Sequence, residues 1–340
     1  MGRVSLFVAA LAIAGGAYGS SLEPTPSLPA PYLEAVLAYR RGDIDTGVVR
    51  LGEWRPEELK RASSAVADSP DDWRLRASAA MLHVEVILQG KANGDSPVSF
   101  HLALAERIID KLDSADFRRR WYSLAGSIYL ARTDPTGASA YIDRGQRLFK
   151  DDARLHMLAG AVNELRSHFA DSNLHDRVTV RLTPPGGRRP LVLAESSYRR
   201  ALDLDSSLDE ARLRLGRVIS LRNDQKAARV ELDRVARHAA VPRLQYLAHL
   251  FLGALAEYQT DFAAAQVEYR AALAIGPACQ TPYIALTFVE EALGHDVAAR
   301  DLMARYAAVS TEAALDPWWF YQNGGIDEES LIWLRQQVRQ

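Results

Sequence analysis

Residues 246–279 read YLAHLFLGALAEYQTDFAAAQVEYRAALAIGPAC, and this stretch decides the fold. Its apolar residues recur at intervals of three and four, which is the spacing of one face of an α-helix. Gly253 lies in the first half, a Thr-Asp-Phe turn at 260–262 interrupts the pattern, and Pro277 ends the run. The stretch therefore predicts two amphipathic helices joined by a tight turn.

The second of these helices recurs along the chain at a nearly constant interval. An alanine followed four residues later by a larger apolar side chain returns at steps of 34, 37 and 34 residues. The four pairs are Ala194 and Tyr198, Ala228 and Leu232, Ala265 and Tyr269, and Ala299 and Met303. Residues four apart share one helix face, and small residues let two helices approach closely. We therefore expect a repeated helix pair.

The repeat resembles the tetratricopeptide repeat (TPR), a helix pair with the pattern W-x-x-L-G-x-x-Y, then A-x-x-x-F, then P. The resemblance covers residues 118–308. In its first two units the pattern begins at Trp121 and Leu155 and places Ala125 and Ala159 in the glycine slot. The resemblance implies an all-α, right-handed α-solenoid of about six to seven TPR-like helix pairs.

The first 19 residues have the order of a secretory signal peptide. Arg3 precedes an apolar run, and the small residues Ala17 and Gly19 follow it, so that cleavage would leave a chain beginning near Ser20. No cysteine follows the run, which argues against a lipid anchor. The alternative is an uncleaved membrane anchor, but the run is shorter than the roughly 20 apolar residues that span a bilayer. We expect a periplasmic or secreted protein, with no stable membrane insertion once the signal peptide is removed.

Composition sets the remaining boundaries. Residues 20–31 carry four prolines and are expected to form an extended tether. Residues 32–117 are expected to form degenerate TPR-like helices, and residues 309–340 an aromatic segment followed by a capping helix. The chain has 36 arginines against 5 lysines, which favours an exported bacterial member of the family.

One insertion interrupts the repeats. The unit that opens at Asp152 reaches the next one at Asp209 after 57 residues, which exceeds one repeat by 23. The excess lies at about residues 170–189, between the two helices of a pair. Alternating apolar residues at 178–182 and a Pro-Pro-Gly-Gly sequence predict a small β-hairpin or an extended flap there. The insertion is either a specificity loop on the binding face or a tolerated surface excursion.

Charge and motifs exclude most other classes of function. The 41 basic and 43 acidic residues leave a formal net charge of −2, so nucleic acid is not expected as a partner. Cys279, the single cysteine, can form neither an intramolecular disulfide nor a thiolate zinc site by itself. The sequence holds no nucleotide-binding, hydrolase or zinc motif. We therefore expect no catalytic residue, no metal and no cofactor, and a protein that is not an enzyme.

In TPR proteins the first helix of each pair lines a concave groove, and the resemblance implies partner-binding residues beside its packing positions. These residues are Tyr122, Tyr129, His156, Asn163, Arg217, Ser220, Leu250, Glu257, Phe288 and Glu291. A bound peptide would meet aromatic rings first, amide and imidazole groups next, and an apolar, acidic patch last. The alternative role of each residue is packing between repeats.

The C-terminal residues are expected to cover the open end of the array. Residues 318–321 are four consecutive aromatics, and Leu331, Leu334 and Val338 form an apolar stripe on a final helix. A terminal repeat must hide its outer face, and large rings cover the most area. The alternative is an aromatic patch that docks a partner or stacks on a sugar.

These features predict an exported protein–protein interaction scaffold that binds a protein or peptide partner in the concave TPR groove. Two alternatives remain open. One is a binder of cell-envelope glycan, and the other is an enzyme that uses the insertion and the aromatic tail.

Overall fold

The computed structural model describes residues 29–69, 72–171, 188–308, 316–321 and 325–339. Within these ranges the chain is all-α and contains no strand. The helices are α1 (Ala30–Arg40), α2 (Ile44–Gly52), α3 (Pro56–Asp68), α4 (Trp73–Leu88), α5 (Val98–Ile109), α6 (Ala115–Ala131), α7 (Pro135–Leu148), α8 (Ala153–Asp171), α9 (Arg188–Leu204), α10 (Asp209–Leu221), α11 (Gln225–His238), α12 (Pro242–Tyr258), α13 (Phe262–Ile275), α14 (Thr281–Ala292), α15 (Asp296–Ala308), α16 (Pro317–Tyr321) and α17 (Glu328–Arg339).

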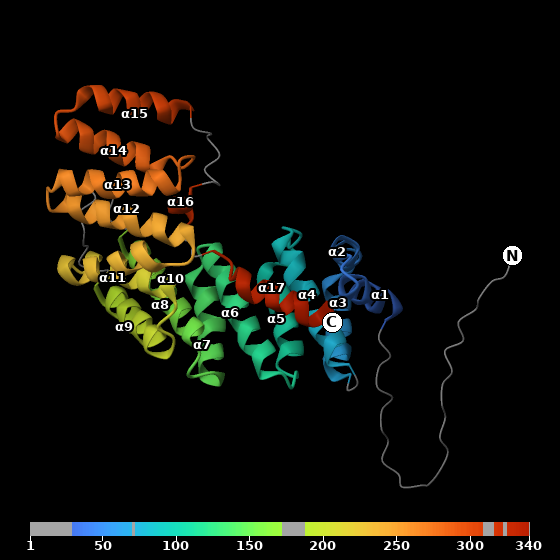
Figure 1. The fold of residues 1–340 in the computed structure, drawn as a ribbon. Helices are drawn as coiled ribbons and strands as arrows, with labels where there is room; N and C mark the ends of the chain where they lie inside the picture. The colour runs from blue at the N-terminus through green and yellow to red at the C-terminus, as the bar shows by residue number, and fades with distance from the viewer. Residues whose placement is uncertain (1–28, 70–71, 172–187, 309–315, 322–324, 340) are drawn as a thin grey trace, which may run out of the picture.

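Fourteen of these helices form seven antiparallel pairs, and the pairs stack into an elongated array (Figure 1). The pairs are α1/α2, α4/α5, α6/α7, α8/α9, α10/α11, α12/α13 and α14/α15. The second helix of one pair packs on the first helix of the next, as α7 does on α8 and α13 on α14. The predicted solenoid of six to seven helix pairs is confirmed.

A recurring turn joins the helices of a pair. Its last residue before the second helix is an aspartate whose carboxylate accepts hydrogen bonds from that helix's first backbone amides, as at Asp134 and Asp261. The residue before the aspartate has a positive φ, 57° at Thr133 and 59° at Thr260. The aspartate satisfies amides that have no partner inside the helix, which fixes where the second helix begins.

The four predicted alanines lie where the helices of a pair meet. Ala194, Ala228, Ala265 and Ala299 are all buried, on α9, α11, α13 and α15. Of the larger residues that follow them, Met303 differs because its side chain is 44% exposed. It lies on α15, the final second helix of the array, so no further repeat covers it.

The N-terminal segment and the insertion fall largely outside the described residues. The predicted signal peptide at 1–19 and the predicted hairpin at 178–182 both lie there. The insertion does separate α8 from α9, the two helices of one pair, as expected. The predicted tether extends too far, because Pro31 already stands in the first turn of α1. Proline is tolerated there since the first amides of a helix have no acceptor within it.

The C-terminal helix lies elsewhere than at the end of the array. The apolar stripe of Leu331, Leu334 and Val338 is buried as predicted. However, α17 packs on α4 and α6, far from α14 and α15, and crosses the first helices of the N-terminal half (Figure 1). The expectation of a cap on the last repeat is thus corrected. The reason is that α4 and α6, which are first helices of their pairs, carry charges complementary to those of α17, as described below.

A polar cluster is buried between α1, α3, α4 and α5. The rings of His83 and His101 approach within 3.0 Å between their Nδ1 atoms, and Nε2 of His83 lies 3.0 Å from the Ser63 hydroxyl. Burial lowers the pKa of His101 to about 4, and burial together with the charge of His101 lowers the pKa of His83 well below its usual value. Burial also raises the pKa of the neighbouring Tyr32 phenol to about 12. Both histidines are therefore neutral in the folded protein at neutral pH.

Acid is expected to destabilise the fold through these two rings. Between pH 6.5 and 4 the unfolded chain protonates both histidines while His101 in the folded chain stays neutral. The unfolded state then binds more protons, so the free energy of unfolding decreases as the pH is lowered, by about 1.4 kcal/mol per pH unit for each ring. Urea unfolding at pH 7.5 and pH 5 measures this loss. It should shrink in the His83→Gln/His101→Gln double variant and persist in His238→Gln, whose ring is exposed. An equal loss in the double variant would contradict the assignment.

Candidate functional site

Glycines on the first helices define which face meets the second helix. A Cβ atom at Gly126 would lie 2.5 Å from a side-chain carbon of Ile142, and one at Gly160 would lie 2.4 Å from the ring of Tyr198. On α12 a Cβ atom at Gly253 would similarly meet a ring of α13 at 2.3 Å. The glycine on each of these three first helices therefore faces the second helix of its own pair. The opposite face of the first helices forms the concave surface of the array.

This contact shifts the repeat pattern by one residue in α6 and α8. The sequence placed Ala125 and Ala159 in the glycine slot, whereas the structure places Gly126 and Gly160 there. One residue corresponds to a rotation of about 100° around a helix with 3.6 residues per turn. Positions assigned to the groove on these two helices therefore move onto the packing faces.

Four of the predicted groove residues, on α6 and α8, accordingly have partners within the fold. Tyr122 is buried, and its hydroxyl donates to carboxylates of Asp110 and Glu106 at 2.7 and 3.2 Å. The ring of Tyr129 stacks on that of Tyr141 in α7 at a centroid distance of 5.8 Å.

The two polar members of this set also have local partners. The ring of His156 lies 3.1 Å from the Gln146 amide and 2.8 Å from the Lys150 carbonyl. Asn163 donates to the Ala159 carbonyl of its own helix at 3.0 Å. The structure thus gives all four residues packing or local hydrogen-bonding contacts.

The predicted residues on α10 and α12 are buried or already contact neighbouring side chains. The guanidinium of Arg217 lies 5.1 Å from the centroid of the Phe251 ring, and Glu257 accepts a hydrogen bond from Tyr269 at 2.9 Å. Ser220 and Leu250 are buried.

The predicted residues on α14 differ because they are open. Phe288 is 51% exposed, its neighbour one turn earlier, Ile284, is 47% exposed, and Glu291 is exposed. The structure therefore leaves uncovered the face of α14 that carries these three residues.

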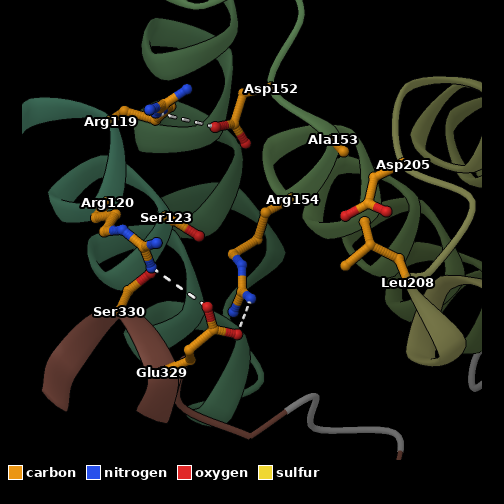
Figure 2. Close-up of a pocket in the computed structure, with 10 residues that line it drawn as sticks. All are labelled: Arg119, Arg120, Ser123, Asp152, Ala153, Arg154, Asp205, Leu208, Glu329 and Ser330. Carbon is orange, nitrogen blue, oxygen red and sulfur yellow. Dashed lines mark hydrogen bonds and ion pairs between the residues drawn. The ribbon is translucent and has the colours of Figure 1, made fainter. Parts of the chain in front are cut away.

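The C-terminal segment covers the concave surface of the N-terminal half. Asp327, just before α17, accepts a hydrogen bond from the Ser123 hydroxyl at 2.6 Å and pairs with Arg154 at 2.5 Å. Its backbone amide donates to the Ser127 hydroxyl at 2.9 Å. Figure 2 shows Arg154 and Arg120 both directed at the carboxylate of Glu329, the second residue of α17. The acidic start of α17 thus lies between α6 and α8.

The other end of α17 is held by a second ion pair. Arg335 donates two hydrogen bonds to the two carboxylate oxygens of Glu85 on α4, each at 2.7 Å. Between the two ends, the Trp333 ring lies 6.3 Å from Phe117 and 5.0 Å from the guanidinium of Arg120. Two-point carboxylate–guanidinium contacts fix direction as well as position, so α17 has a defined orientation in the groove.

The segment before α17 is anchored further along the array. Tyr321 donates to Glu164 of α8 at 2.9 Å, and its carbonyl accepts from Arg214 of α10 at 3.2 Å. Asp316 accepts from the Tyr246 hydroxyl of α12 at 2.8 Å and from the Thr281 hydroxyl of α14 at 2.7 Å. The described parts of the C-terminal segment therefore contact the first helices from α14 back to α4.

Two of the cavities that border the C-terminal segment lie near the start of α17. One of about 280 Å³ is lined by Arg119, Arg120 and Arg154 together with Asp152 and Glu329 (Figure 2). Each of these arginines pairs with a carboxylate, so their charge is balanced within the protein. The other, about 640 Å³, lies between α8, α10 and the 325–329 segment and combines apolar side chains with charged ones. Among the described residues no cluster of three His, Cys, Asp or Glu side chains could hold a metal ion.

The rings of the aromatic segment take part in the fold. Trp318 packs against Phe251 at a centroid distance of 5.5 Å, and Tyr321 packs against the same ring at 4.9 Å. The sequence singles out these aromatic residues but does not show which helices they contact. The feature of the sequence that indicates the contacts of the C-terminal helix is its charge pattern. An acidic start is followed by Arg335, and the rest of the chain is rich in arginine.

The architecture defines a TPR-like α-solenoid whose groove is partly filled by its own chain. No family model and no curated protein matches the chain. The fold is similar to solved TPR-repeat structures. MamA is 16% identical with a TM-score of 0.42, covering 58% of this chain and 93% of MamA. PilW, a type IV pilus biogenesis factor, is 15% identical with a TM-score of 0.48 over 72% and 98% of the two chains.

A third similar structure is human IFIT1, solved as a dimer with m7Gppp-AAAA. It is 14% identical with a TM-score of 0.44, covering 83% of this chain and 68% of IFIT1. Similarity at this level concerns the fold alone. No helix in the described part of the chain is both long and apolar enough to cross a membrane.

Proposed function

We propose that this chain is an exported scaffold that binds a protein or peptide partner along the concave face of its solenoid. The observation that supports this is that the face already holds a helix of the same chain, through an apolar stripe and ion pairs at both ends. Receiving an amphipathic helix in a groove is a common mode of protein recognition. The chemistry of the surface therefore suits a protein partner.

The uncovered part of the face is the proposed point of contact. On α14 the half-exposed side chains of Ile284 and Phe288 lie beside Glu291. Phe262 extends this apolar surface, with its ring 6.3 Å from that of Phe288. An apolar patch with an acid at its edge favours a partner segment that carries apolar and basic side chains. The net charge of −2 also favours protein over nucleic acid.

Site-specific photocrosslinking in the native host tests this proposal. A benzoylphenylalanine residue at Ile284 is expected to crosslink a discrete partner protein. The same residue at Val230, which is 64% exposed on the second helix α11, is the matched control and should give no such product. The measurement is the mass of the crosslinked band and its identification by mass spectrometry. Equal crosslinking from both positions, or from neither, would refute binding at the concave face.

Export is a separate part of the proposal and rests on residues 1–19. We expect the mature protein to begin near Ser20 and to lie in a periplasm or outside the cell. N-terminal sequencing of the protein purified from the native cell envelope measures the start directly. A native protein that retains Met1 and fractionates with the cytosol would contradict export.

A further inference from the structure

The groove floor under α17 is more polar than a permanent helix joint. It contains Glu85 of α4 and Ser123 and Ser127 of α6, all with little exposed area while α17 is present. By comparison, the joint between α6 and α7 is formed by side chains such as Trp121 and Ile142. Polar groups are costly to bury unless each is paired, whereas water pairs with them when a surface is vacated. The floor is therefore compatible with solvent as well as with a bound helix.

The polar groups of the floor are hydrogen-bonded to α17 and to Asp327 just before it. Ser123 donates to the Asp327 carboxylate, Ser127 accepts from the Asp327 amide, and Glu85 accepts from Arg335. The apolar contribution of α17 is the stripe of Leu331, Leu334 and Val338 with the partly buried Trp333 beside it, while Ile332 on its outer face is 54% exposed. This is the division that a docked amphipathic helix shows, with one face in the groove and the other in water.

The contacts define what kind of helix the groove accepts. The acid at Asp327 and the base at Arg335 are eight residues apart, about 12 Å along a helix. The buried apolar residues fall between and beyond them, at Leu331, Leu334 and Val338. The acceptable pattern is therefore an acid, apolar residues four and seven positions later, a base at the eighth position and an apolar residue at the eleventh.

We propose that the concave surface of α4, α6 and α8 is a docking site for a partner helix with this pattern, and that α17 is an internal occupant which the partner replaces. This extends the proposed scaffold function by naming the recognised chemistry. As α17 belongs to the same chain, its effective concentration at the groove is high, and a free helix competes poorly with it. Weakening the anchors of α17 while keeping the groove intact should therefore open the site.

The experiment uses the full-length chain and a labelled peptide of residues 325–340 as the probe. The Asp327→Ala/Arg335→Ala variant removes the acid before α17 and the base near its other end, and it leaves Glu85, Ser123 and Arg154 in place. We expect the peptide to bind this variant at least about tenfold more tightly than it binds the unaltered chain, as measured by fluorescence anisotropy. The matched control is Asp233→Ala/Arg237→Ala, which removes an ion pair on α11 and should bind as the unaltered chain does.

A peptide with the acid and the base exchanged tests whether the anchors carry recognition. It should bind the variant at least about tenfold more weakly than the unchanged peptide, since it places like charges together at both ends of the groove. Circular dichroism of the variant should show unchanged helicity, and light scattering should show a monomer.

Three results would overturn the proposal. The first is a folded variant that does not bind the peptide, and the second is a variant that unfolds, because α17 would then be an obligatory part of the core. The third is a variant that dimerises, because the occupant would then be the α17 of a second copy. The crosslinking test at Ile284 does not depend on α17, so the scaffold function and this docking site can fail separately.

Discussion

Replacing Arg214 by methionine is expected to lower the free energy of unfolding by about 3–5 kcal/mol. The side chain of Arg214 is almost fully buried, and it pairs with Glu164 at 3.3 Å and with Glu210 at 3.1 Å. Its removal leaves the Glu164 carboxylate buried without a positive partner. The phenols of Tyr198 and Tyr321 still donate to that carboxylate. Burial and the negative charge of Glu164 raise the pKa of both phenols, so they stay neutral and do not replace the positive charge of the guanidinium.

Urea unfolding followed by circular dichroism measures this effect. The Glu164→Met/Arg214→Met double variant is expected to be less damaged than Arg214→Met alone, because it removes both charges together. Arg199→Met serves as the control, since Arg199 forms an exposed pair with Glu195 and should cost at most about 1 kcal/mol. If Arg214→Met lowered the free energy of unfolding by less than about 1 kcal/mol, the Glu164 carboxylate would not be left without a compensating partner.

Replacing Gly160 by leucine is expected to destabilise the chain by about 2–3 kcal/mol. Even the Cβ atom would lie 2.4 to 2.8 Å from three ring carbons of Tyr198, which is fully buried and cannot move aside without disturbing its hydrogen bond to Glu164. The gain from a better helix former, about 1 kcal/mol, does not offset the clash.

The shift in the unfolding midpoint measures the loss. Gly52→Ala is the control, because a Cβ atom there meets nothing within 4 Å, and it should be neutral or slightly stabilising. A Gly160→Leu chain as stable as the unaltered one would show that Gly160 does not face α9, and would restore the alignment read from the sequence.

The helix pairs could be predicted from the sequence because their determinants are local. An alanine with a large apolar residue four positions later, as at Ala265 and Tyr269, encodes a close helix contact within one turn. The face of α6 could not be fixed in this way. Ala125 and Gly126 are both small, and only the contact with Ile142 shows which one faces the second helix.

The position of the C-terminal helix could not be predicted because its contacts are far apart in the sequence. Arg335 and Glu85 are separated by 250 residues, and no periodicity connects them. The stripe of Leu331, Leu334 and Val338 predicted a buried face but carried no information about what would bury it. Phe288 on α14 is exposed because the helix that the sequence predicted at this end of the array lies on α4 and α6 instead.

The return of the C-terminal segment changes how the array unfolds. In a simple solenoid each repeat contacts only its neighbours, so end repeats can fray one at a time. Here the contacts of Asp316 with α12 and α14 and of Arg335 with α4 tie the two halves through one segment. Fraying at either end then disturbs the same C-terminal segment, which favours a single concerted melting step. Folding is expected to be slow because the contact of Arg335 with Glu85 closes a loop of 250 residues.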